Sequence, residues 1–163
     1  MELRHLIDEF DSAAGLEHAP AAEGVWKYSA DGHVFGITAD DSGERLFIFG
    51  EVEAPPPERA EAFRDAVLKA NFFGRGTGGA TFSLNPDTEA YTLVQSDRID
   101  SLNPGSFFLL VEKFVNTLAT WNGIAAAADL EKSSFDGDQE GGQSANAGHA
   151  LSKERPMGEY MQV

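Results

Sequence analysis

The dipeptide Asp31-Gly32 lies between two stretches, 25–30 and 33–39, in which residues alternate between two faces of a strand. An Asp-Gly pair in this setting is a strong signal for a two-residue hairpin turn, because both residues tolerate the positive φ that the turn requires. A two-residue turn also fixes which residues lie opposite each other. The sequence therefore predicts an antiparallel hairpin in the first third of the chain.

Helical spacing of apolar residues, strand alternation and turn residues predict the other elements. Proline and Asn-Pro mark helix starts after 56 and at 103, and Asn71 is a candidate cap for the middle helix. Helices and strands are segregated along the chain, which favours an α+β fold with an antiparallel sheet and helices on one face. The predicted order is α-β-β-β-α-β-β-α, with helices at 3–14, 57–70 and 104–121 and strands at 25–30, 33–39, 45–53, 80–84 and 90–96.

The hairpin registers sort the strand residues into two faces. A four-residue turn at 40–43 would pair Ile37 with Leu46 and Phe35 with Ile48. One face of the first three strands is then apolar and is expected under the helices: Trp26, Tyr28, Phe35, Ile37, Leu46, Ile48 and Val52. The corresponding inner residues of the second hairpin are Phe82, Leu84, Tyr91 and Leu93.

The opposite face of the sheet is mixed in character. Phe47 and Phe49 stand there beside Val34 and the bare backbone of Gly36. Leaving two phenylalanines in water forgoes roughly 1.5–3 kcal/mol each. An exposed apolar patch on an acidic protein predicts a protein partner, unless a loop or the C-terminal tail covers it.

Composition excludes several other partners and compartments. The chain has 12 basic and 27 acidic side chains, a net charge of −15, which disfavours nucleic acid and anionic membrane surfaces. There is no cysteine, so disulfides and thiol catalysis are excluded. No stretch has the ~20 apolar residues of a membrane span, and the N-terminus lacks the pattern of a signal peptide. We expect a cytoplasmic protein without membrane insertion.

The glycines of the loop FFGRGTGGATFSL have the spacing G-x-G-x-x-G, at Gly74, Gly76 and Gly79. A dinucleotide fingerprint needs a strand before the glycines and a helix after them. Here a helix precedes the loop and a strand follows it, so we interpret the loop as a flexible connection. The histidines have no metal-ligand spacing and no nucleophile motif is present. The sequence predicts no enzyme activity, no metal and no cofactor.

The composition changes at about Lys132. Gly, Ser, Gln, Asn and acidic residues dominate from there, without a sustained apolar period. Such a segment buries too little surface to offset its chain entropy. We predict a folded domain at 1–131 and a disordered polar tail at 132–163.

This element order, with the size and the acidic charge, resembles the class I type III secretion chaperones, the Tir-chaperone family. The resemblance spans about 1–130, although the first third matches only in element order and alternation. The glycine loop and the longer tail depart from the family core. The closest match runs from Leu68 to Trp121: LKAN at 68–71, GATFSLN at 79–85, DTE at 87–89, YTL at 91–93 and the long helix that follows.

The resemblance implies a bacterial cytoplasmic homodimer that binds the N-terminal segment of a secreted effector and keeps it soluble and secretion-competent. Such chaperones have no ATPase activity of their own. The first helix is expected to extend the outer sheet face, although its apolar residues have the simpler role of packing on the sheet. Candidate effector-binding residues are Val34, Gly36, Phe47, Phe49, Leu3, Leu6 and Phe10.

The second hairpin is the candidate dimer interface, because an isolated sheet edge invites pairing. Two other functions stay open at this point. One is a regulatory interaction module on the same fold that sequesters a secretion regulator. The other is a small-molecule-binding domain or enzyme, which the apolar inner face disfavours because a ligand pocket needs converging polar groups. The candidate dimer residues are Thr81, Ser83, Thr92 and Val94.

Overall fold

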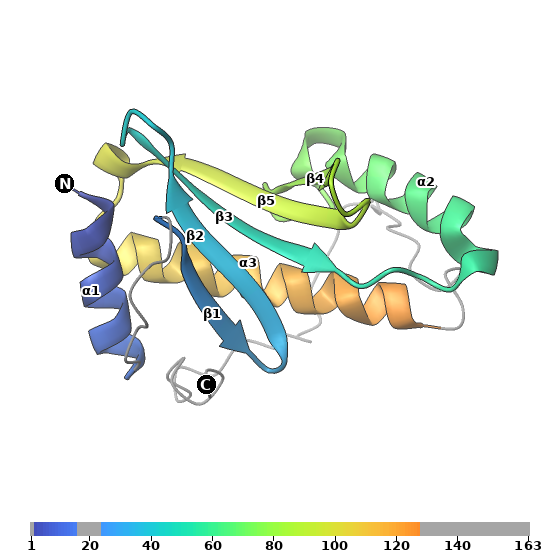
Figure 1. Cartoon of the computed structure of the whole chain (residues 1–163), viewed down its shortest axis with the longest axis horizontal. Coiled ribbons are helices and arrows are strands. Elements are labelled where there is room, and N and C mark those ends of the chain that lie inside the picture. Colours follow the sequence, from blue (N-terminus) through green and yellow to red (C-terminus); the bar gives the residue numbers. More distant parts are fainter. Residues whose placement is uncertain (1, 16–23, 128–163) are drawn as a thin grey trace, which may run out of the picture.

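Five antiparallel strands form a single sheet, and the helices lie against one of its faces (Figure 1). The computed structural model describes residues 2–15 and 24–127. The strand order is β1-β2-β3-β5-β4, and the predicted element order and α+β class are confirmed. The elements are α1 (Leu3–Ala14), β1 (Trp26–Ala30), β2 (His33–Ala39), β3 (Arg45–Val52), α2 (Ala60–Asn71), β4 (Thr81–Leu84), β5 (Tyr91–Arg98) and α3 (Pro104–Ala126), with 3₁₀ turns at Pro57–Arg59, Phe72–Gly74 and Ile99–Ser101.

Local signals account for the helix ends. α1 stops at Gly15, which adopts a left-handed φ of 70°. α3 starts with a capping box, in which Asn103 and Ser106 exchange side-chain hydrogen bonds with each other's backbone N–H, both at 2.9 Å. Asn71 was predicted to cap α2, and this is wrong. Its amide instead accepts a bond from the N–H of Phe82 (2.8 Å) and donates to the C=O of Phe82 (3.2 Å), which attaches β4 to the end of α2.

The first hairpin has the predicted register, with Asp31 and Gly32 at φ of 49° and 81°. The β2–β3 register differs from the prediction by two residues, because Ile37 pairs with Ile48. The cause is Asp40, whose carboxylate accepts the backbone N–H of Glu44 (3.0 Å) and of the next residue (3.2 Å). These bonds move the loop one residue along the chain. A shift of two residues leaves both sheet faces unchanged.

The core lies between the inner sheet face and α3. Phe10 of α1 contacts Tyr28 and Phe107 edge-on, with ring centroids 5.5 and 5.8 Å apart. Phe63 of α2 meets Trp121 of α3 at 5.9 Å. The predicted inner residues of the first three strands are all buried except Trp26, which is half-buried, so this prediction is confirmed. The buried residues of α3 are Phe107, Val111, Phe114, Val115, Leu118, Trp121, Asn122 and Ala125.

The glycine loop connects a helix to a strand, as predicted, but it is compactly folded. Trp121 donates its indole N–H to the C=O of Gly76 at 2.9 Å. Gly76 in turn donates its backbone N–H to Ala70 (3.2 Å), and Thr77 is buried. The loop therefore forms part of the packing around the end of α3.

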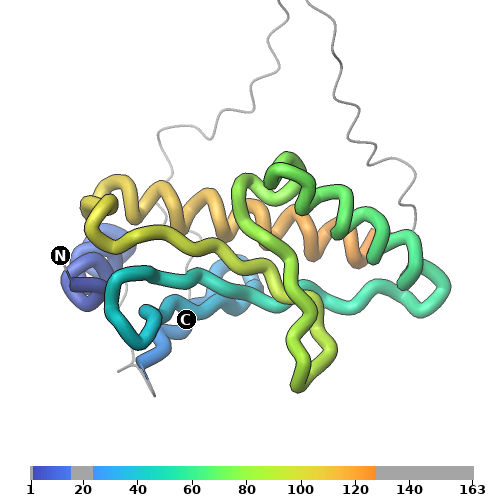
Figure 2. The backbone as a smooth tube through the Cα atoms, turned by 90° about the horizontal axis from the view of Figure 1, so that it is seen from above, coloured from blue at the N-terminus to red at the C-terminus, as the bar shows by residue number. Residues whose placement is uncertain are grey.

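The second hairpin has the predicted register, with Leu84 opposite Tyr91, but its inner face is not buried along its whole length. Phe82 and Leu93 are buried, but Leu84 is 57% exposed. Its direction follows the strand alternation, yet it stands at the last position of β4, where the hairpin turn projects beyond the sheet on the side away from α3 (Figure 2). The predicted tail at 132–163 and its boundary lie outside the described residues.

Candidate interaction surface

The outer face of the sheet has no helix against it among the described residues, and its strands align residues in rows. One row crosses the whole sheet, because Gly36 pairs with Lys27 on one side and with Phe49 on the other, Phe49 pairs with Val94, and Val94 pairs with Thr81. Phe49 is half-buried, whereas Val34, next to this row, is 62% exposed. The predicted outward placement of the two residues is confirmed by their register.

A hollow of about 300 Å³ lies on this face. We call it the outer-face hollow. It is lined by Lys27, Val34, Phe35, Gly36, Phe49, Gly50, Glu51, Asn85 and Thr92.

The floor of the outer-face hollow depends on Gly36. A Cβ atom at this position would lie 2.5 Å from Cζ of Phe49, so the aromatic ring rests directly on the glycine backbone. Sequence reasoning expected Gly36 to allow close approach of a partner. In the structure, the ring of Phe49 fills that space, and Gly36 contributes by leaving room for the ring against the backbone of β2.

The β4–β5 turn forms one wall of the outer-face hollow. Glu51 accepts hydrogen bonds from Asn85 (3.4 Å) and from Thr88 (3.3 Å) through Oε1. These bonds join the turn to β3, and the turn rises from the sheet on its outer side (Figure 2). The sheet face is thereby concave at this end.

Phe47 lies one row away from the outer-face hollow. It pairs with Thr38 and Ser96 and is half-buried. Arg45 reaches across to donate to Ser96 Oγ at 2.9 Å. Phe47 thus extends the apolar surface along β3, with a polar rim at its end.

The candidate residues of α1 do not belong to this surface. Leu3, Leu6 and Phe10 are 6%, 0% and 2% exposed. They pack against the sheet and α3, which is the simpler role that their helical spacing allows. Because they are buried, these three residues are removed from the effector-binding set that the sequence predicted.

The four candidate dimer residues fall into two groups. Thr81 and Ser83 are exposed on β4, an edge strand of the sheet. Thr92 and Val94 lie on β5 between β3 and β4, where Val94 is the neighbour of Phe49. The second pair therefore shares a surface with the candidate effector-binding residues.

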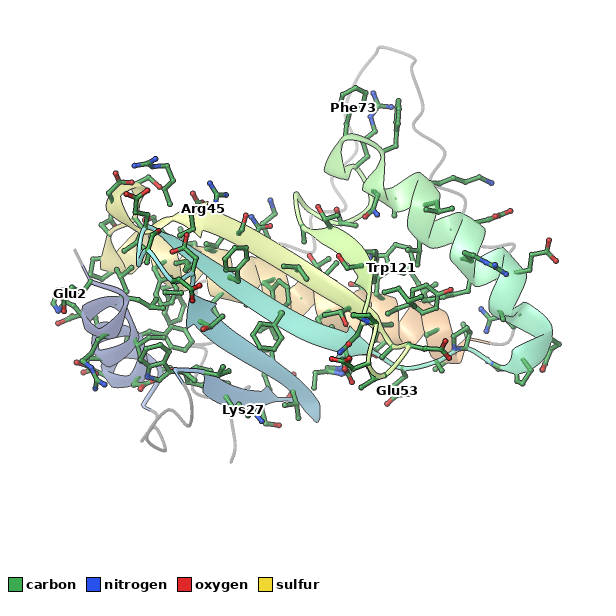
Figure 3. All side chains as sticks on the ribbon, turned by 45° about the horizontal axis from the view of Figure 1, so that its top comes forward. Glu2, Lys27, Arg45, Glu53, Phe73 and Trp121 are labelled. Atoms are coloured by element: carbon green, nitrogen blue, oxygen red, sulfur yellow. The ribbon has the colours of Figure 1, made fainter. Side chains whose placement is uncertain are left out.

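A second apolar surface was missed by sequence reasoning. Leu68, Phe72 and Phe73 at the end of α2 are 63%, 61% and 84% exposed, and we call them the α2 patch. The two phenylalanine rings pack edge-on at 4.6 Å. The signal was the i, i+4 spacing of Leu68 and Phe72, outside the buried stripe of the helix. Figure 3 shows Phe73 on the opposite side of the molecule from Lys27.

Two polar pairs in the interior hold elements together. Tyr28 donates its hydroxyl to Asp11 at 2.9 Å, and burial together with the charge of Asp11 raises the pKa of Tyr28. Asn122 accepts the backbone N–H of Glu53 (2.8 Å) and lies 3.0 Å from Nδ1 of His33.

Among the described residues no cluster of three or more His, Cys, Asp or Glu could hold a metal ion, and no helix is long and apolar enough to cross a membrane.

The fold is similar to chains from three solved complexes. A chain of the HopA1–SchA chaperone–effector complex has a TM-score of 0.63 at 15% identity, and the match covers 74% of this chain and 93% of that chain. A chain of the ExsC–ExsE complex has a TM-score of 0.65 at 16% identity, and the match covers 79% of this chain and 100% of that chain. A chain of the ExoT–SpcS complex from Pseudomonas aeruginosa has a TM-score of 0.57 at 15% identity, and the match covers 73% of this chain and 96% of that chain. These likenesses support the fold.

Sequence comparison identifies the family. No curated protein sequence matches the chain significantly. Residues 5–122 match the model of the Tir chaperone protein (CesT) family, which is most of the chain and includes all the strands. The chain therefore belongs to the Tir chaperone protein (CesT) family.

Proposed function

We propose that this protein is a type III secretion chaperone that binds the N-terminal segment of an effector as a homodimer and keeps it soluble and secretion-competent. Family membership supports the general role. The likeness to a chain from a chaperone–effector complex is consistent with an effector as the partner. The observation that carries the proposal for this chain is the concave outer face with exposed Val34 and half-buried Phe47 and Phe49.

The geometry suits an extended segment. Such a segment presents alternate side chains to one side, and these can enter apolar depressions while its main chain bonds to a strand edge. Among the described residues, β1 is an edge strand and borders the outer-face hollow through Lys27. We infer that one part of the effector segment crosses the hollow over Phe49 and an adjoining part pairs with β1.

The proposal is tested with an effector encoded beside the chaperone gene, co-expressed and purified with it. Replacing Phe47 and Phe49 by serine is expected to weaken binding by about 2 kcal/mol, or about thirtyfold in Kd, as for buried aromatic anchors. Isothermal titration calorimetry measures the loss, and thermal melting checks the fold. V34S changes a more exposed residue of the same surface and is expected to act in the same direction.

Leu109 supplies the matched control. It is 63% exposed on α3, on the other side of the sheet from the proposed surface. L109S should leave the Kd unchanged. Unchanged binding in both V34S and the double phenylalanine variant would reject the outer face as the effector site.

The proposed homodimer contact lies on a different surface from the proposed effector site. We infer that it forms through the edge of β4, with Thr81 and Ser83, and through the α2 patch. Phe72 and Phe73 support this, since leaving two such rings in water forgoes roughly 1.5–3 kcal/mol each. Thr92 and Val94 are assigned to the effector side because they adjoin Phe49.

Light scattering at tens of micromolar tests the dimer. The unaltered chain should have twice the mass of the 17.5 kDa monomer, and replacement of Phe72 and Phe73 by serine should shift it to the monomer. A monomeric unaltered chain would refute the homodimer. A dimer that persists in the double variant would refute the α2 patch as its interface.

A further inference from the structure

The outer-face hollow has two ionisable side chains in its lining, and they have opposite charges. Lys27 belongs to β1, and Glu51 belongs to β3. Because β2 separates these strands, the two charges lie on opposite sides of the hollow. The rest of the lining is uncharged, with Val34 and Gly36 of β2 between the two charges and Phe49 next to Glu51 along β3.

The position of Glu51 is set by the hairpin turn. Its Oε1 atom accepts bonds from Asn85 and Thr88, which keep the carboxylate at the wall of the hollow. The turn also carries Asp87 and Glu89. The hairpin side is thus negative, whereas Lys27 is the one basic residue in the described lining of the hollow.

The spacing of the strands sets which positions of a bound effector segment can reach Lys27 and Glu51. Neighbouring strands lie about 4.8 Å apart, so β1 and β3 are separated by about 10 Å. An extended chain advances about 7 Å for every two residues. Glu51 also lies two residues along β3 from Phe49, which shares a row with Gly36 and Lys27, so the diagonal from Lys27 to Glu51 is about 12 Å. Side chains two positions before and after a central one are about 14 Å apart. They reach both charges when the central side chain lies over β2, beside Val34 and Phe49.

We propose that the effector segment in the outer-face hollow has an apolar residue flanked at two positions by a basic residue on the Glu51 side and an acidic residue on the Lys27 side. This inference rests on the proposed function and specifies the partner's chemistry at the same site. The apolar residue supplies contact with Val34 and Phe49. The two ion pairs fix the register and the direction in which the segment crosses the sheet.

The experiment uses four synthetic fluorescent peptides of nine residues with a central leucine. The positions two residues before and after leucine are Arg and Asp, both Arg, both Asp, or both Ser. Fluorescence anisotropy with the full chain measures each Kd. We expect the Arg/Asp peptide to bind about three- to tenfold more tightly than the others, a range set by the modest strength of exposed ion pairs. The difference should shrink in 0.5 M NaCl, because salt screens exposed charges.

Charge reversal in the protein makes the test specific. E51K gives the hollow two cations and should favour the Asp/Asp peptide, whereas K27E gives it two anions and should favour Arg/Arg. The K27E/E51K double variant should again prefer Arg/Asp, bound in the opposite direction. The control variants K69E and E61K reverse exposed charges on α2 and should leave the preference of the unaltered chain unchanged.

The outcomes separate this inference from the proposed function. Equal affinity for all four peptides, no binding of any of them at millimolar concentration, or preferences that do not follow the reversals would overturn the charge pattern. The effector titration with F47S/F49S is independent of these results. If that titration shows the expected loss while the peptides fail, the outer face remains the effector site and only the flanking charges are rejected.

Discussion

At the residue scale, two glycines in neighbouring strands serve opposite faces of the sheet. A Cβ at Gly50 would lie 2.6 Å from Leu118 Cδ2, within the core. A Cβ at Gly36 would meet the ring of Phe49 on the outer face. Each glycine lets one large side chain lie directly on the backbone, so Gly50 matters for stability and Gly36 for the shape of the outer-face hollow.

Gly50→Ala is expected to destabilise the protein by about 1–3 kcal/mol, the usual cost of overpacking a core. The added methyl group must displace Leu118, which is fully buried. Urea denaturation measures the change. Gly123→Ala is the control, because a Cβ there meets nothing within 4 Å, and it should stabilise α3 by about 0.5–1 kcal/mol. Equal stability of the two variants would contradict this packing.

Asp40 predicts a pH dependence. The backbone N–H of Arg45, followed by the Ser42 hydroxyl and the N–H of Glu44, lowers the pKa of Asp40 below its ordinary value of 3.8. A lowered pKa in the folded state means that the ionised carboxylate stabilises the fold above about pH 4 and that this contribution is lost as the pH falls through the folded pKa. Asp40→Ala should therefore melt below the unaltered chain at pH 7, and the gap should close in acid.

Thermal melting between pH 2 and pH 7 checks this expectation. Asp41→Ala, at the exposed neighbouring position of the same turn, is the control and should follow the unaltered chain at every pH. A gap for Asp40→Ala that stays constant into acid would show that the charge has no role in the turn.

At the scale of elements, α3 organises the molecule, and its C-terminal end is held by Arg59, the last residue of the 3₁₀ turn that precedes α2. Arg59 donates to the C=O of Ile124 (3.1 Å) and to the C=O of Ala125 (3.3 Å). These carbonyls carry the negative end of the helix dipole and have no partner within the helix. One guanidinium thus satisfies the end of α3 and joins it to α2.

Arg59→Met is expected to cost about 1 kcal/mol of stability, the typical net value of such contacts. The last turn of α3 should also exchange its amide hydrogens faster, which hydrogen-exchange mass spectrometry detects. Arg64→Met removes an exposed arginine of α2 and should change neither quantity. If both variants behave alike, the bonds of Arg59 do not stabilise the end of the helix.

At the scale of the whole molecule, the described residues already form a continuous core. It includes residues from α1, the five strands, α2 and α3. Besides the separate exposed leucines Leu84 and Leu109, the described residues leave two apolar surfaces outside this core, the outer sheet face and the α2 patch. We assign them to different partners, an effector and a second copy of the chain.

Removal of residues 132–163 is predicted to leave the melting temperature nearly unchanged, since the segment has no periodic apolar face. Differential scanning calorimetry of the truncated and full chains measures this. A loss of several degrees would contradict the prediction and would mean that the tail packs on the folded part. Light scattering of the same two samples shows whether the dimer depends on the tail.

The elements and the inner face of the sheet were determined by the sequence alone, because their signals are local. Helical periodicity, the Asp31-Gly32 turn and the Asn103 cap each act within a few residues, and alternation sorted Phe47 and Phe49 to the outer face. The α2 patch had a similar local signal in the i, i+4 spacing of Leu68 and Phe72, which the sequence-based interpretation did not use.

Tertiary structure decided what depends on contacts between distant segments. Asn71 bonded to a strand 11 positions away, whereas the shift of the β2–β3 register came from side-chain bonds of Asp40 within its own loop. Leu84 has the direction that alternation assigns to it, but no helix covers that end of β4. The outer-face hollow exists because Lys27, Glu51 and Asn85 come together from two strands and a turn, and the energy of such contacts depends on packing that no local pattern encodes.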